Sequence, residues 1–298
     1  MSAPAASVAP TQAGAVVQAA CWMLGSIASF TAMTIAGREV SVAMDTFEIM
    51  LWRSLIGVVL VMALAAGTGR LAEVRTARLG DHAIRNLVHF AGQNFWFLAI
   101  AVAPLAQVIA VEFTAPLWVL LLAPLMLGET VRRRQIAVAS VGFAGVVLVA
   151  QPFGGSVSPG LLWAALAALG FAVTNLLTRR LTKDETVLGI MAWLTAMQLL
   201  LGLLCAGIDG DVALPDRATA PWLAVIGLAG LAAHFCLTHA LRLAPASAIM
   251  PVDFARLPII AVAGTILYGE TLDPLVILGG AVILGAAWAN LRIARRMS

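Results

Sequence analysis

The sequence predicts an all-helical integral membrane protein in which ten transmembrane helices form two inverted five-helix repeats. Three observations lead to this fold class: an apolar composition, ten long apolar stretches, and a repeat at a spacing of 141 residues. Of the 298 residues, 61% are hydrophobic and 11% are charged, whereas a soluble domain carries about 25% charged residues. Such a chain has too few polar side chains to form the surface of a water-soluble protein of this size. The composition therefore excludes a soluble enzyme, a disordered chain and a basic nucleic-acid-binding protein.

Ten apolar stretches are long enough to cross a bilayer, whose core is about 30 Å thick and needs about 20 residues of helix. They cover residues 14–36, 46–66, 84–103, 105–127, 135–150, 159–178, 187–207, 220–241, 245–267 and 274–291. We therefore expect a tail over 1–13, a first repeat over 14–150, a second repeat over 151–291 and a basic tail over 292–298.

The distribution of Lys and Arg predicts how the helices are oriented. With a cytoplasmic N-terminus, fourteen of the eighteen basic residues fall on the cytoplasmic side. Arg38 and Arg217 fall on the opposite side, and Arg53 and Arg256 lie within spans. Because cytoplasmic loops are enriched in Lys and Arg, this asymmetry supports ten crossings with both termini cytoplasmic.

The repeat is visible when the sequence is shifted by 141 residues. The matched residues are Trp22 and Trp163, Phe30 and Phe171, Arg38 and Arg179, Ala103-Pro104 and Ala244-Pro245, and Gly128-Glu129-Thr130 and Gly269-Glu270-Thr271. With five helices in each repeat, the second copy enters the membrane from the opposite side. Inverted repeats are typical of alternating-access transporters, in which the solute site lies near the midplane between the repeats.

These features resemble the drug/metabolite transporter superfamily and, within it, the EamA-type exporters. The resemblance also rests on the run Leu237-Thr238-His239-Ala240-Leu241-Arg242 before the second Ala-Pro turn, and on Arg53, whose repeat counterpart is Leu194. It covers about residues 15–291 and implies an exporter of amino acids or similar small amphipathic metabolites in a bacterial-type inner (plasma) membrane. The aromatic amino-acid exporters are the nearest branch that it suggests.

Glu112 and Asp253 are repeat counterparts, and each lies eight residues into its span from opposite sides of the membrane. At 1.5 Å per residue both are about 12 Å deep, where an ionisable group costs about 2.5–3.5 kcal/mol. Arg256 follows Asp253 by three residues and can pair with it, whereas Ala115 leaves Glu112 without a partner on its own helix. Glu112 is then a proton or amine site, and Asp253 with Arg256 is a dock for a zwitterion. The alternative is a structural bridge, with Glu112 bonded to a neighbouring helix.

Prolines and polar side chains at the same depth complete the predicted cavity. Pro116 and Pro258 each free the carbonyl of the residue four positions earlier, and we expect hinges at both positions. The remaining candidates for solute binding are Trp22, Asn94, Trp96, Trp163 and His234. Each has a structural alternative, such as core packing for a tryptophan or a satisfied hydrogen bond for the histidine. We expect no metal or cofactor, because no ligand spacing of the zinc type occurs.

Two further expectations concern the ends of helices and other function classes. Gly128 and Gly269 suit left-handed helix caps, and the following Glu129 and Glu270 are expected to serve the start of the next helix. The sequence has no His-Glu-x-x-His or Gly-x-Ser-x-Gly motif, which argues against an intramembrane enzyme. A channel or a sensor remains the main alternative to a transporter. A monomer is favoured because no Gly-x-x-x-Gly occurs, and a homodimer stays open.

Overall fold

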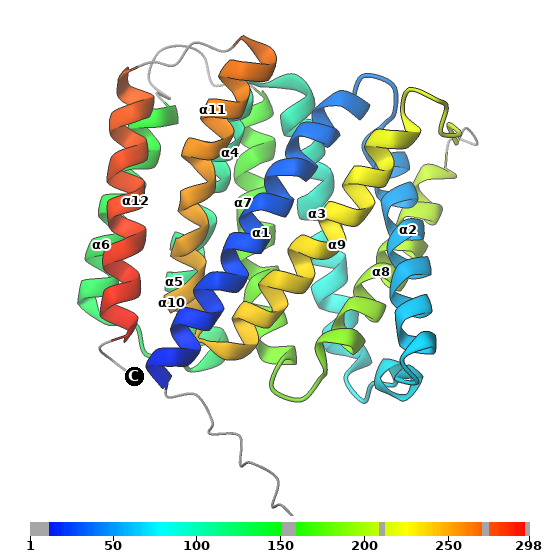
Figure 1. Ribbon diagram of the computed structural model, residues 1–298, viewed down its shortest axis with the longest axis horizontal. Coiled ribbons are helices and arrows are strands. Elements are labelled where there is room, and N and C mark those ends of the chain that lie inside the picture. Colours follow the sequence, from blue (N-terminus) through cyan, green and yellow to red (C-terminus); the bar gives the residue numbers. More distant parts are fainter. Residues whose placement is uncertain (1–11, 151–158, 209–211, 270–273, 296–298) are drawn as a thin grey trace, which may run out of the picture.

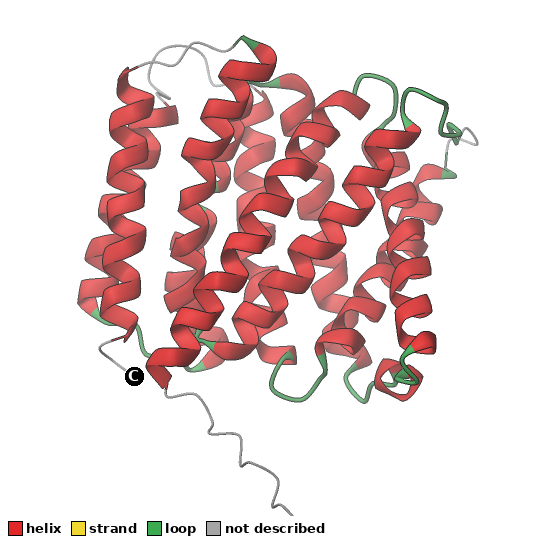
Figure 2. Cartoon of the chain, viewed as in Figure 1, coloured by secondary structure: helices red, strands yellow, loops and turns green. Residues whose placement is uncertain are grey.

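The computed structural model describes residues 12–150, 159–208, 212–269 and 274–295, and this part of the chain contains helices and connections but no strand (Figures 1 and 2). The elements are α1 (Gln12–Val40), α2 (Thr46–Gly67), η1 (Leu71–Val74), α3 (Leu79–Val102), α4 (Leu105–Glu112), α5 (Ala115–Leu127), α6 (Arg133–Ala150), α7 (Pro159–Leu181), α8 (Val187–Ala206), α9 (Ala220–Leu243), α10 (Ala246–Ile249), η2 (Met250–Ala255), α11 (Arg256–Tyr268) and α12 (Pro274–Arg295).

Seven helical segments within the described residues are long and apolar enough to cross a membrane. Two of them, Gln107–Leu127 and Ala246–Tyr268, consist of consecutive shorter elements rather than one continuous helix. The fourth and ninth predicted spans are therefore helical, but each is interrupted near its middle. α3 begins at Leu79, five residues before the predicted span. Its first turn is polar, so the apolar stretch in the sequence did not include it.

Local signals in the sequence set several helix ends. The Asp45 side chain accepts hydrogen bonds from the backbone N–H groups of Phe47 and Glu48, at 2.7 and 2.8 Å, while Glu48 accepts from the Asp45 N–H. This reciprocal arrangement is a capping box. α5 and α11 both end at a glycine with positive φ, 66° at Gly128 and 65° at Gly269, which confirms the predicted left-handed caps.

The two repeats are interleaved and do not form two separate bundles. The most extensive helix contacts join α1 to α9, α3 to α7, α2 to α8 and α6 to α12, and each pair takes one helix from each repeat. Small residues permit the closest approach: a Cβ atom at Gly170 of α7 would lie 3.1 Å from the Gly92 Cα of α3. A central space between the repeats is therefore surrounded by helices of both, because the repeats interlock and do not stand side by side.

Equivalent residues make equivalent contacts in the two repeats, which run through the bundle in opposite directions. In Figure 1, α2 descends and its counterpart α8 ascends. The Arg38 Nη1 atom donates to the Ile100 carbonyl at 3.1 Å, and the Arg179 Nη1 atom donates to the equivalent Leu241 carbonyl at 2.5 Å. Each arginine thereby supplies donors to the carbonyls at the C-terminal end of a neighbouring helix, α3 or α9.

Glu129 serves a helix of the other repeat and not the next helix along the chain. Its carboxylate accepts hydrogen bonds from the backbone N–H groups of Ala246 and Ser247, both at 3.3 Å, at the start of α10. Arg179 lies against the same carboxylate, with its Nε atom 3.5 Å away. The expectation for Glu129 is corrected accordingly, and Glu270 lies outside the described residues.

Candidate functional site

A cavity lies in the middle of the bundle, where both interrupted spans approach α1, α3, α7 and α9. Its free volume is about 50 Å³, several times the ~10–15 Å³ that a single water needs. Polar and charged residues in its wall include Ser26, His89, Gln93, Glu112, Thr174, Asn175, His234, Asp253 and Arg256, and its apolar wall includes Phe30, Met33, Trp96, Phe113 and Phe171.

The helix breaks place the charged residues at the cavity wall. Glu112 is the last residue of α4, and Pro116 lies in the first turn of α5. In the other repeat, six residues form the 3-10 segment η2, and Arg256 begins α11. A proline has no N–H to donate and disfavours the preceding helical turn, which accounts for the break after Glu112. Backbone that leaves the helix at this depth must lie against protein or line a cavity.

Arg256 joins the two carboxylates of the repeats into one ionic cluster. Its Nη2 atom contacts the Glu112 Oε1 atom in a short hydrogen-bonded ion pair, and it lies 3.1 Å from the Asp253 Oδ2 atom. Only 3% of the Arg256 surface is exposed. The predicted pairing of Asp253 with Arg256 is confirmed. Glu112 lacks a partner on its own helix, as expected, but it finds one across the repeats.

Aromatic groups hold this cluster in place. The Trp96 Nε1–H group donates to the Glu112 Oε2 atom at 2.7 Å. The Arg256 guanidinium carbon lies 5.3 Å from the ring centroid of Phe30 and 5.1 Å from that of Phe113, within range of cation–π attraction. Phe113 in turn meets its repeat counterpart Phe254 edge to face at 5.8 Å. The cluster therefore lies where equivalent parts of the two repeats meet.

The electrostatics of the cluster favour a cationic group. With all three side chains ionised, two carboxylates and one guanidinium leave one net negative charge among largely buried side chains at the cavity wall. Attraction between charges is much stronger in such a site than in water. The Asp253 Oδ1 atom has no hydrogen-bond partner among the described residues, so one carboxylate oxygen remains available to an ammonium or another cationic group.

The structure brings together most, but not all, of the site residues predicted from the sequence. Trp96, Glu112, His234, Asp253 and Arg256 line the cavity, together with the predicted hinge residue Pro116. Asn94 is buried with its amide donating to the Phe90 carbonyl of its own helix at 2.8 Å. Pro258 packs near Gly280 of α12. Neither Asn94 nor Pro258 is among the described residues that line the cavity.

The aromatic pair in the cavity wall is Phe30 and Phe171, not the predicted Trp22 and Trp163. Trp22 stacks on His239, with ring centroids 4.7 Å apart, and Trp163 stacks on Phe95 at 5.5 Å. The cavity lies at the middle of the 29-residue helix α1, where Met23, Ser26, Phe30 and Met33 face it at helical spacing. The match of Phe30 with Phe171 in the repeat was the signal that could have identified this pair.

Two buried histidines lie side by side at the cavity wall. The rings of His89 and His234 meet edge to face with centroids 4.7 Å apart, and Phe30 lies 5.4 Å from His234. Both ring nitrogens of His89 and the Nε2 atom of His234 lack a hydrogen-bond partner within the described part of the chain. Unpaired buried polar atoms are uncommon in proteins, so this wall presents unused hydrogen-bonding groups to the cavity.

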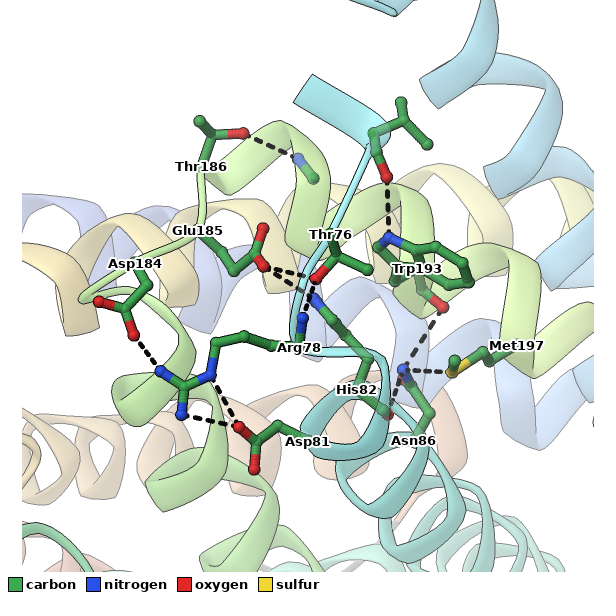
Figure 3. Close-up of polar contacts among 12 residues, drawn as sticks. Thr76, Arg78, Asp81, His82, Asn86, Asp184, Glu185, Thr186, Trp193 and Met197 are labelled. Atoms are coloured by element: carbon green, nitrogen blue, oxygen red, sulfur yellow. Dashed lines mark hydrogen bonds and ion pairs between the residues drawn. The ribbon is translucent and has the colours of Figure 1, made fainter. Parts of the chain in front are cut away.

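A second polar cluster lies at one end of the bundle, where the α2–α3 and α7–α8 connections meet (Figure 3). Thr76 donates to the Glu185 Oε1 atom at 2.5 Å, and Arg78 forms a short ion pair with Asp184. The Trp193 Nε1–H group donates to the Val74 carbonyl at 2.9 Å. These contacts fasten a connection of the first repeat to one of the second, away from the central cavity.

Comparisons with known proteins agree with the repeat and with the fold. The model of the EamA-like transporter family matches the chain twice, over residues 17–151 and 158–292. A solved crystal structure superposes with a TM-score of 0.78 at 20% identity, covering 95% of this chain and 99% of that one. At this identity the superposition shows the fold alone.

Two of the curated relatives are named as transporters of organic metabolites. The S-adenosylmethionine uptake transporter of Rickettsia prowazekii (strain Madrid E) is 25% identical over 266 residues, which are 89% of this chain and 90% of the relative. The riboflavin transporter of Rhizobium johnstonii is 32% identical over 227 residues, which are 73% of this chain and 72% of the relative. Neither name refers to amino-acid export. Both halves of the sequence match one family model, and this chain therefore belongs to the EamA-like transporter family, whose members are membrane transporters and not enzymes.

Proposed function

We propose that this transporter carries an amphipathic organic metabolite with a cationic or zwitterionic group, and that it does so by alternating access through the central cavity. The observation that supports this most is the buried ionic cluster of Glu112, Asp253 and Arg256, which lines that cavity and carries one excess negative charge when all three groups are ionised. Burying a charge in a bilayer is costly. Charged residues at this depth are therefore usually either paired or required for function.

The substrate class combines the site chemistry with the relatives. S-adenosylmethionine, named for one relative, is itself an amino-acid derivative with cationic groups, so it falls in the same class as the amino acids suggested by the sequence. Aromatic rings in the wall, such as Phe30, Phe171 and Trp96, offer stacking surfaces for an aromatic part of the solute. Amino acids and heterocyclic metabolites with an amino group are therefore the substrates to test first.

Conformational change follows from the size of the cavity. A free volume of about 50 Å³ holds a few waters but not an organic metabolite. The described conformation is then one in which the solute site is contracted, and it must widen toward one side of the membrane during transport. Pro116 and Pro258 lie at or near the helix breaks, and we propose them as the hinges. The same cycle supports export or uptake, depending on the gradients that drive it.

Transport in proteoliposomes tests this proposal. We expect saturable counterflow of at least one labelled member of a panel containing aromatic and aliphatic amino acids, S-adenosylmethionine and riboflavin, with no conductance steps in planar bilayers. Both insertion orientations should be separated by a protease cut or a single label, so that the direction of flux is measured. Protein-free liposomes are the control. The absence of saturable binding and of flux across the whole panel would contradict the proposal, and discrete single-channel currents would indicate a channel.

We also propose ten crossings with both termini on the cytoplasmic side, which the asymmetry of Lys and Arg supports. Cysteine labelling checks this in a background without Cys21, Cys205 and Cys236. We expect Arg217→Cys to react with a membrane-impermeant maleimide in intact cells, and Arg75→Cys to react only after permeabilisation, because both side chains are exposed on opposite sides. The reverse pattern would show that the whole bundle is inserted the other way round.

A further inference from the structure

A smaller cavity lies beside the central one, between α2, α8 and α9, and contains the buried side chain of Arg53. Its free volume is about 10 Å³, which is room for one group the size of a water. His234 belongs to the walls of both cavities. The two cavities therefore adjoin at His234, which lines the solute site on one side and the Arg53 cavity on the other.

Arg53 has no acidic partner among the residues that the structure describes. Only 6% of its surface is exposed, and the hydrogen bond recorded for its guanidinium goes to the Met50 Sδ atom at 3.7 Å. Sulfur is a weak acceptor. Among the ion pairs of the described residues none includes Arg53 or its neighbour Arg85. Buried charges are normally paired, so Arg53 lacks the anionic partner that its guanidinium would be expected to have.

The side chains around Arg53 also favour an anion at this place. Arg85 donates to the Thr178 Oγ1 atom at 3.0 Å and to the Asn86 Oδ1 atom at 2.9 Å, and neither partner carries a charge that could neutralise it. The charges of Arg53 and Arg85 repel each other. In the wall of the smaller cavity, the Ser54 hydroxyl and the His234 Nε2 atom have no hydrogen-bond partner in the described part of the chain.

Gly230 leaves space next to the guanidinium. A Cβ atom at this position of α9 would lie 3.8 Å from the Arg53 Cζ atom and 3.2 Å from the Sδ atom of Met33, a residue of the central cavity wall. The missing side chain therefore keeps open the strip of wall between the two cavities. Filling it would crowd both neighbours without removing the positive charge.

We infer that Arg53 binds an anionic group of the transported solute, a carboxylate or a phosphate, when the two cavities widen during transport, while the acidic cluster of the central cavity binds its cationic part. The inference rests on the proposed function and refines it, because it assigns the two charges of a dipolar solute to two places. Arg256 is already shared between Glu112 and Asp253, so the zwitterion dock expected there has no unpaired cation to offer. Arg53 has one.

Histidine NMR of the full chain in lipid nanodiscs tests the inference with simple probes. The chain contains four histidines, so the imidazole nitrogen signals of His89 and His234 can be assigned by substitution. Sodium acetate and sodium phosphate are titrated at an ionic strength held constant with sodium chloride. We expect saturable shifts of the His234 signal, and a response to acetate or to phosphate identifies the preferred anionic group.

Four variants show whether Arg53 is responsible. Arg53→Gln is expected to weaken the apparent anion affinity at least tenfold, whereas Arg53→Lys keeps most of it. Gly230→Val keeps the charge but fills the space, and it should also weaken binding. Arg75→Gln removes one exposed arginine from a connection and should leave the titration unchanged. The inference is overturned if the His234 signal of the natural sequence does not saturate with either anion. It is also overturned if Arg53→Gln binds the anion with the same apparent affinity as the natural sequence.

A transport comparison separates this inference from the proposed function. For a solute that the panel identifies, the analogue without its anionic group should be carried with a KM at least tenfold higher, and Arg53→Gln should abolish that difference. If the acid and its ester or amine analogue are carried equally well, the anion site is refuted and the transporter function stands. If nothing in the panel is carried while the anion titration still saturates, the proposed function fails and the anion site stands.

Discussion

Replacing Arg256 by leucine is expected to lower the free energy of unfolding by about 3–5 kcal/mol, because the buried carboxylate of Glu112 and the partly buried carboxylate of Asp253 lose the partner that they share. The substitution leaves Glu112 with the Trp96 N–H group and Asp253 with no recorded partner for its carboxylate. Unfolding in mixed micelles and the thermal transition in detergent measure the effect. Arg256→Lys keeps the charge but not the two-sided guanidinium geometry, and we expect an intermediate loss.

A neutral version of the same cluster separates its structural role from its role in transport. Glu112→Gln, Asp253→Asn and Arg256→Leu combined remove all three charges, and replacing buried ion clusters by neutral groups of similar volume often leaves stability unchanged. We expect the triple variant to unfold within about 1 kcal/mol of the natural sequence and to carry no solute. A stable triple variant that still transports would show that the cluster is only a structural bridge.

Glu112→Gln alone is expected to reduce transport by one to two orders of magnitude. The change preserves the shape of the side chain but removes the net negative charge of the cavity, and a hydrogen bond to a charged group contributes about 1.5–3 kcal/mol. The measurement is kcat/KM for the solute identified in proteoliposomes, together with its response to a pH gradient. If Glu112 also exchanges a proton, the variant should no longer respond to that gradient.

The matched control for this variant is Glu73→Gln. Glu73 lies in the short segment η1 and pairs with Arg70 at 2.6 Å on the surface, and a surface ion pair of this kind contributes little. Glu73→Gln removes one negative charge, as Glu112→Gln does, but at a distance from the cavity. Transport should therefore be unchanged. Equal losses in both variants would show that net charge, not the cavity site, determines the rate.

The repeat predicted most of what is now seen at the centre of the molecule. The depth of Glu112 and Asp253 followed from counting residues in two apolar stretches of opposite direction, and the pairing of Asp253 with Arg256 followed from helical spacing. The ion pair between Glu112 and Arg256 joins residues 144 positions apart. Such a contact depends on how the two repeats pack, and helical periodicity carries no information about that packing.

Other errors have equally physical causes. Trp22 shares a helical face with Ser26 and matches Trp163 in the repeat, which favours it for the cavity wall. Its ring stacks on His239 instead, and Phe30, two turns further along the same helix, lines the cavity. The carboxylate of Glu129 was assigned to the nearest helix in the sequence, whereas a short turn brought the start of α10 within reach. Both cases required knowledge of which helices are neighbours in space.

The four most extensive helix contacts all join one repeat to the other, and this has a consequence for how such a chain is assembled. A five-helix half by itself would leave the faces of α1 and α3 that pack on α9 and α7 without their partners. A single repeat would need a second copy of opposite orientation in the same bilayer to complete these contacts. Joining the two repeats in one polypeptide sets both their one-to-one ratio and their opposite directions.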